Sequence, residues 1–167
     1  MFGLTSLGVI HTAISLVAVA AGLIALLRDK QITSGNRLGQ VYFVTTLLTA
    51  VTSLGIFQHG GFGKAHALGI LTLLVLVVIM VAYRTQFYGR WSRVVEVVGY
   101  SATFLFHMIP AVTETTTRLP LGAPLLASAE APALQVATAV MGLLFLIGAY
   151  FQVRRLRPAS AAGAVAT

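Results

Sequence analysis

The sequence contains no cysteine and very little charge. Only 9% of its 167 residues are charged, whereas a typical soluble domain is about 25% charged. The hydrophobic share is 57% and the mean hydropathy is +0.91. This composition excludes a soluble globular enzyme, a disordered chain and a free nucleic-acid-binding domain. The absence of cysteine excludes disulfides, thiolate metal sites, iron–sulfur clusters and covalent haem attachment.

Basic residues nevertheless outnumber acidic ones, with eleven Lys and Arg against four Asp and Glu and a net charge of +7. Nucleic-acid-binding domains gather such residues on one face. In this chain the basic residues are scattered between long apolar runs, which is typical of membrane proteins. We therefore expect the lipid bilayer, and no nucleic acid, as a partner.

Five apolar segments come close to the roughly 20 residues that a helix needs to cross a bilayer core of about 30 Å. They predict an all-α integral membrane bundle in one domain, residues 1–157. The predicted spans are about 4–27, 41–57, 65–83, 94–111 and 133–153. Two of these, 41–57 and 94–111, are short, and an extra turn at the inner end would lengthen each. The Ala-, Ser- and Gly-rich tail, residues 158–167, is expected to be disordered.

The basic residues divide unequally between alternate loops, which predicts the orientation. One side carries nine of them: Arg28, Lys30, Arg37, Arg84, Arg90, Arg93, Arg154, Arg155 and Arg157. The other side carries only Lys64 and Arg118. We expect the N-terminus outside and the C-terminus in the cytoplasm, in a membrane of the bacterial inner-membrane type. Because no basic residue precedes the first apolar run, that run is predicted to be a retained span and not a cleaved signal peptide.

All four histidines fall in the outer half of this topology: His11, His59, His66 and His107. Two of them, His11 and His107, lie inside apolar spans, where ionisable groups are costly and usually mark a site. On the fourth span, Tyr100 and Thr103 share a helix face with His107. Glu114 would join that face if the helix continued past Pro110.

Neutral imidazole is a good ligand for haem iron and transition metals. One hypothesis is that His11, His66 and His107 bind haem b for electron transfer, with Gly8 and Gly69 leaving room for the macrocycle. A second is a transition metal ion held by a larger set: His11, His59, His66, His107 and Glu114. A third is that no cofactor binds and the imidazoles bond to threonine or backbone groups. The histidine spacing matches no HExxH-type zinc motif.

Other function classes also remain open. Residues 112–132, a Pro-rich outer loop, would suit a non-catalytic subunit or assembly factor that docks a partner. The threonine-lined second span would suit binding or permeation of a small molecule. Candidate protein partners are a redox partner, a membrane complex or a second copy of the chain. At the inner interface Arg93 and Glu96 are expected to form a local ion pair. No phosphate-binding loop, Ser/His/Asp set or pair of intramembrane carboxylates is present, so the sequence shows no apparatus for hydrolysis, ATP-driven transport or proton pumping. It does not otherwise assign or exclude an enzymatic activity.

The stretch 11–78 carries three short motifs: a Gly-Leu-Ile-Ala-Leu-Leu segment at 22–27 after the first-helix histidine, Arg-Leu-Gly-x-x-Tyr at 37–42 and Gly-Phe-Gly-x-x-His at 61–66. On these motifs the chain resembles a large bacterial family of predicted membrane proteins of unknown function. The resemblance implies that His11 and His66 are the two histidines of functional interest. The family usually has a histidine where this chain has Asn36, so an inner-side histidine role is absent here. The layout is also similar to small cytochrome b561-type bundles, by architecture alone.

Overall fold

The computed structural model describes residues 5–57 and 61–156, and in these residues it contains helices and no strand. In chain order the helices are α1 (Ser6–Asp29), α2 (Arg37–Ser53), α3 (Lys64–Thr85), the short 3-10 helix η1 (Gly89–Trp91), α4 (Ser92–Arg118) and α5 (Pro132–Leu156). His59 and the tail at 158–167 lie outside the described residues.

Four helical segments are long and apolar enough to cross a membrane. They are α1, α3, α5 and the continuous stretch Gly89–Arg118 that joins η1 to α4. The predicted all-α membrane bundle is confirmed at this level. The remaining α-helix, α2, has only 17 residues and is not among the four segments that are long enough to span a membrane.

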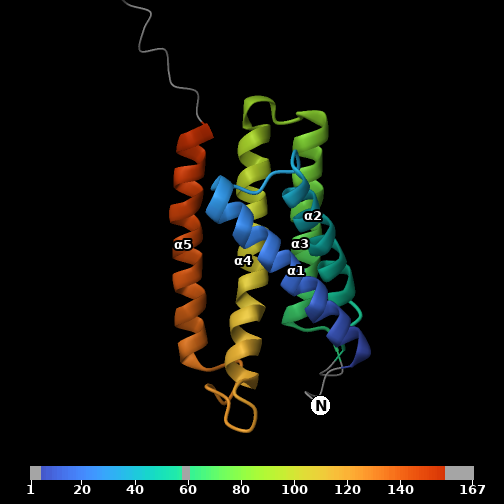
Figure 1. Ribbon diagram of the computed structural model, residues 1–167, viewed down its shortest axis with the longest axis vertical. Helices are drawn as coiled ribbons and strands as arrows, with labels where there is room; N and C mark the ends of the chain where they lie inside the picture. Colours follow the sequence, from blue (N-terminus) through green and yellow to red (C-terminus); the bar gives the residue numbers. More distant parts are fainter. Residues whose placement is uncertain (1–4, 58–60, 157–167) are drawn as a thin grey trace, which may run out of the picture.

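The helices pack as neighbours along the chain, in the order α1, α2, α3, α4 and α5. Figure 1 shows α3, α4 and α5 along the long axis of the molecule, with α1 crossing obliquely in front of α4. Helix α5 packs on α4 and buries only Leu134 and Gln152. One helix therefore stands at the side of the bundle with most of its apolar surface open to lipid.

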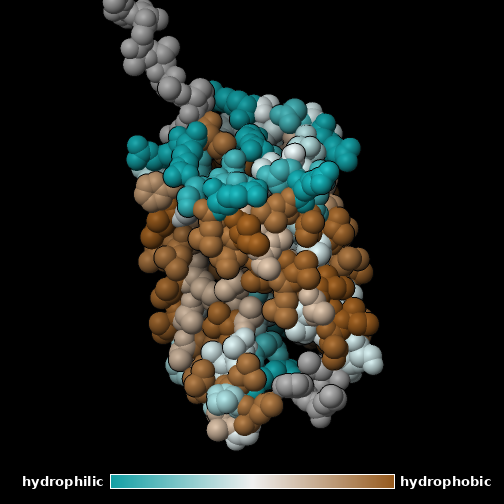
Figure 2. Space-filling view, in the orientation of Figure 1, coloured by the Kyte–Doolittle hydropathy of each residue, from teal (hydrophilic) through white to brown (hydrophobic). Residues whose placement is uncertain are grey.

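The two ends of the bundle differ in character. Figure 2 shows a broad apolar belt and, at the end where α5 finishes, a hydrophilic band. We call this the basic end, because the helix ends that meet there carry Arg28, Lys30, Arg37, Arg84, Arg90, Arg93, Arg154 and Arg155. The opposite end, where α1 and α3 begin, is called the histidine end.

Helix α4 continues through Pro110, so the predicted span 94–111 and the predicted loop 112–132 are corrected to a helix ending at Arg118 and a loop at 119–131. Beyond the proline, hydroxyls support the helix, and that of Thr113 donates to the Ile109 carbonyl at 2.9 Å. The helix stops where Leu119 becomes extended, because the residue before a proline, here Pro120, is disfavoured in helical geometry. Glu114 and Arg118, one turn apart at the end of the helix, form an ion pair.

Helix α2 begins at Arg37, so its predicted limits 41–57 are corrected to Arg37–Ser53. The side chain of Asn36 accepts a hydrogen bond from the Gly39 amide at 2.8 Å and caps the helix. This is the extra inner turn expected from the shortness of the apolar run.

A buried carboxylate holds the α1–α2 connection to α4. Glu96 is only 2% exposed, and its two oxygens accept from the Ser34 amide at 2.7 Å and the Arg93 guanidinium at 2.8 Å. The same guanidinium donates to Thr33 at 2.9 Å, and Ser34 bonds the Tyr100 hydroxyl at 2.8 Å. The expected Arg93–Glu96 pair is confirmed, and it is part of a larger clamp across three segments of the chain.

The clamp makes Gly39 a sensitive position. A Cβ there would lie 1.8 Å from the Thr33 carbonyl oxygen, which the clamp holds in place. We expect Gly39→Ala to destabilise the bundle by about 1–3 kcal/mol through overpacking. Gly142→Ala is the matched control, since a Cβ at that position meets nothing within 4 Å. Thermal unfolding of both variants in detergent, followed by circular dichroism, measures the difference, and equal midpoints would contradict the clamp.

Candidate functional site

Helix α2 presents a ladder of hydroxyl groups to the helices around it. Thr46, Thr49 and Ser53 are buried, and Thr52 lies one turn after Thr49. Three of these hydroxyls have a polar partner on another helix, and that of Ser53 donates to the Ala50 carbonyl of α2 itself. Ser15 of α1, for example, donates to the Thr49 hydroxyl at 3.3 Å. The predicted threonine-rich face of the second span is therefore an internal packing face.

His11 of α1 bonds to this ladder through Nδ1, which lies 2.9 Å from the Thr52 hydroxyl oxygen. That hydroxyl already donates to the Leu48 carbonyl at 2.8 Å, so it accepts from the imidazole. The Thr49 carbonyl is a second acceptor beside the same ring. His11 therefore carries its proton on Nδ1 when neutral, and its Nε2 keeps a free lone pair.

His107 of α4 lies on the other side of the ladder. It is 8% exposed, and its Nε2 is 3.1 Å from the Thr46 hydroxyl oxygen. Its ring also meets the edge of Tyr42, with centroids 6.1 Å apart. Tyr42 is itself fixed, because its hydroxyl bonds that of Thr103 at 2.9 Å. The His107 ring is thus held by two groups of α2.

His107 and Glu114 both lie on α4, seven residues apart and therefore on one face of the helix. This shared face was predicted from the sequence, on the condition that the helix passed Pro110. That condition is met.

His66 stands in a different environment at the start of α3. Its ring is stacked on Phe62, with centroids 5.4 Å apart, and lies 4.7 Å from the ring of Phe57. Its Nδ1 accepts from the Gly63 amide at 3.2 Å, so in the neutral ring the proton is on Nε2. This Nε2 is buried and finds no acceptor among the described residues. His66 is therefore a hydrogen-bond donor, and in this tautomer it has no nitrogen lone pair for a metal.

The other predicted site residues are less closely gathered. Within 5–57 and 61–156, no three His, Asp or Glu side chains come together as a group able to hold a metal ion. His59, which belonged to the predicted metal set, lies outside the described residues. The space expected beside Gly69 is filled, since a Cβ there would lie 2.1 Å from the Ser53 hydroxyl oxygen and 3.2 Å from the Ala50 carbonyl oxygen. That glycine serves the close packing of α3 on α2.

Sequence reasoning missed one of the two partners of Glu96. Glu96 lies four residues before Tyr100, on the same face of α4 as Thr103 and His107, and this spacing was the available signal. Interpreting the pair with Arg93 as purely local hid the second partner, the Ser34 amide, which is distant in the chain.

No protein-family model, curated protein or solved structure matches this chain.

The bond between His11 and Thr52 can be tested by removing its acceptor. Thr52→Val keeps the shape of the side chain and leaves the His11 Nδ1–H to compete for the Thr49 carbonyl. We expect a loss of stability on the order of 1 kcal/mol. Thr45→Val is the matched control, because the Thr45 hydroxyl donates to carbonyls of its own helix, those of Val41 and Tyr42. Equal unfolding midpoints for the two variants would show that the bond contributes nothing.

Proposed function

We propose that the protein is a membrane protein with five spans, its N-terminus outside and its C-terminus in the cytoplasm, and that its histidine end binds haem b for electron transfer. The single observation that carries the haem proposal is the state of His11. Its Nδ1–H is donated to the Thr52 hydroxyl of α2, which leaves the Nε2 lone pair free.

The proposed orientation rests on the basic end. The helix ends that meet there carry eight of the eleven Lys and Arg residues, including Arg37, Arg84 and Arg155. An excess of Lys and Arg marks the cytoplasmic side of membrane proteins. The histidine end then faces outward, and a redox partner would be met on that side.

The fifth span in this proposal is α2. Its 17 residues make a helix of about 25 Å at 1.5 Å per residue, slightly less than the hydrocarbon core of about 30 Å. The helix begins at the basic end and runs toward the histidine end beside α1 and α3 (Figure 1). Its hydroxyls are turned to other helices, which is how polar groups are accommodated inside a bilayer.

His11 is the residue that would bind the haem iron, through its Nε2. A ligating imidazole usually donates its second ring N–H to a neighbouring group, which fixes the ring and raises its basicity. The Thr52 hydroxyl and the Thr49 carbonyl supply such acceptors here. His11 is also the first-helix histidine that the resemblance to the bacterial membrane family singles out. Haem b bound at this position would supply one-electron transfer.

The other two histidines would have different tasks in the site. His107 is held through Nε2, which leaves Nδ1 as its second polar atom. His66 does not fit as a ligand in its present tautomer, because its Nδ1 is an acceptor. Its Nε2–H is suited to an acidic or carbonyl oxygen, such as a haem propionate would offer. His11 is therefore the residue on which iron binding should depend.

The visible spectrum of the protein purified in detergent from haem-replete cells tests the proposal. We expect a Soret band, which His11→Ala abolishes because iron loses its ligand. His66→Gln is the matched control and should keep the band, since the glutamine amide still offers an N–H donor and no iron ligand is removed. A colourless wild-type preparation would overturn haem binding, and a band that survives His11→Ala would overturn the ligand assignment.

The orientation can be tested separately, because the natural chain has no cysteine. Single cysteines at Ser128, in the loop after α4, and at Thr85, at the end of α3, place one thiol at each end of the bundle. A membrane-impermeant maleimide should label Ser128→Cys in intact spheroplasts and Thr85→Cys only after permeabilisation. The opposite pattern would reverse the proposed topology.

A further inference from the structure

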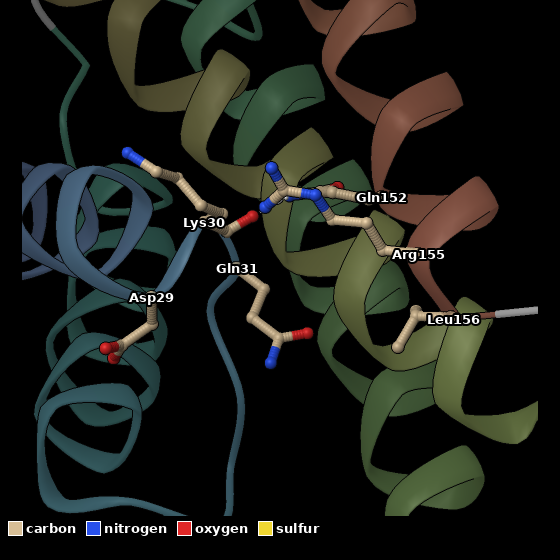
Figure 3. Close-up of a pocket in the computed structure, with 6 residues that line it drawn as sticks. All are labelled: Asp29, Lys30, Gln31, Gln152, Arg155 and Leu156. Atoms are coloured by element: carbon tan, nitrogen blue, oxygen red, sulfur yellow. Dashed lines mark hydrogen bonds between the residues drawn. The ribbon is translucent and has the colours of Figure 1, made fainter.

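Two adjoining cavities lie at the basic end, between the last turns of α1 and α5. The first, of about 180 Å³, is drawn in Figure 3 and is lined by Asp29, Lys30, Gln31, Gln152, Arg155 and Leu156. The second, of about 300 Å³, adds three residues of the apolar belt: Leu26, Gly148 and Phe151. Because both cavities share Lys30, Gln152 and Arg155, they form one groove, which we call the α1–α5 groove.

The α1–α5 groove changes character along its length. Its outer part, which lies at the basic end, is lined by charged and amide side chains. Its inner part, which lies within the apolar belt, is lined by aliphatic and aromatic ones. Gly148 lies seven residues before Arg155, so the groove reaches about 10 Å into the apolar belt. A Cβ on Gly148 would meet nothing within 4 Å, which leaves the inner part open to a ligand.

One arginine points into the groove. In Figure 3 the Arg155 guanidinium extends from α5 toward the backbone carbonyl of Lys30, beside Gln152. Its neighbour Arg154 is directed elsewhere, with its guanidinium carbon 5.8 Å from the centroid of the Tyr150 ring. Two adjacent residues of equal charge therefore differ in whether they face the groove.

The negative groups near the groove are already neutralised. Asp29 is paired with Arg28 at 2.8 Å, and in Figure 3 its carboxylate points away from Arg155. The Leu27 carbonyl accepts from the Lys30 ammonium at 2.6 Å, and the Lys30 carbonyl accepts from Gln152 at 3.1 Å. The exposed carbonyls at the end of a helix would otherwise repel an anion. The outer part of the groove consequently presents a positive charge.

We propose that the α1–α5 groove binds one anionic phospholipid. The Arg155 guanidinium holds the phosphate, for which its planar fork offers two parallel N–H donors. One acyl chain lies along Leu26, Gly148 and Phe151. Basic pockets between helices at the cytoplasmic side of membranes recognise such head groups, and the polar-to-apolar order of this groove matches head and chain.

Native mass spectrometry of the full chain, titrated with phosphatidylglycerol or with phosphatidylcholine of the same acyl chains, tests this proposal. We expect one tight phosphatidylglycerol site and roughly tenfold weaker binding of phosphatidylcholine. Arg155→Gln should reduce phosphatidylglycerol to the phosphatidylcholine level. Arg154→Gln, the matched control with the same loss of charge, should bind as the wild type does. Gly148→Leu should weaken both lipids, because it fills the acyl part of the groove without changing the charge.

Three results would overturn the proposal. Equal losses in Arg154→Gln and Arg155→Gln would mean that the attraction is diffuse surface charge. Unchanged binding in Gly148→Leu would mean that no chain enters the groove. Displacement of phosphatidylglycerol by inorganic phosphate at equal concentration would mean that the site takes a free anion. Unfolding midpoints equal to that of the wild type establish that each variant is folded.

Discussion

The burial of the Glu96 carboxylate is the constraint on which the arrangement of the bundle depends. A carboxylate that is removed from water must have hydrogen-bonding partners for its oxygens. Without them, the free-energy cost of desolvating the charge exceeds the stabilisation gained by packing. Its partners come from two places, the guanidinium of Arg93 one turn earlier and the amide of Ser34 on the α1–α2 connection. Satisfying one charge therefore fixes the end of α1, the start of α2 and the first turns of α4 relative to one another.

From this clamp a polar face runs along α4 toward the histidine end. Glu96, Tyr100, Thr103, His107 and Glu114 follow one another at helical spacing, and all but the last are buried. From the first to the last of them the helix advances about 27 Å, close to the thickness of a bilayer core. Lipid gives no hydrophobic advantage to packing one apolar helix face against another, so interhelical hydrogen bonds and close contacts hold the helices together. Two residues of α2, Thr46 and Tyr42, supply partners to the His107 end of this face. At its other end, Ser34 bonds both Tyr100 and Glu96.

Much of this arrangement follows from local pattern. The apolar runs predicted the approximate positions of the five α-helices but not the short helix η1, and the spacing of small and polar residues predicted which face of α4 looks inward. What could not be predicted depends on contacts between distant segments. The clamp needs Ser34 to approach Glu96 across 62 residues of sequence. The end of α4 at Arg118 depended on local support after Pro110, where threonine hydroxyls return to the backbone. The space beside Gly69 was misjudged, because a glycine can leave room either for a ligand or for a neighbouring helix, and the sequence does not distinguish the two. In the structure, α2 fills this space.

The histidines illustrate the same limit at the scale of single atoms. Sequence patterning treats His11 and His66 as equivalent, since each is an imidazole near the outer end of a span. Their hydrogen bonds make them opposites. The Thr52 hydroxyl accepts from His11 Nδ1 and leaves its Nε2 as a base, whereas the Gly63 amide donates to His66 Nδ1 and leaves its Nε2 as a donor. The role of the His11 ring is set by the packing of α1 on α2, because its bonding partner belongs to α2. The role of the His66 ring is set locally, by the amide of Gly63 at the start of its own helix.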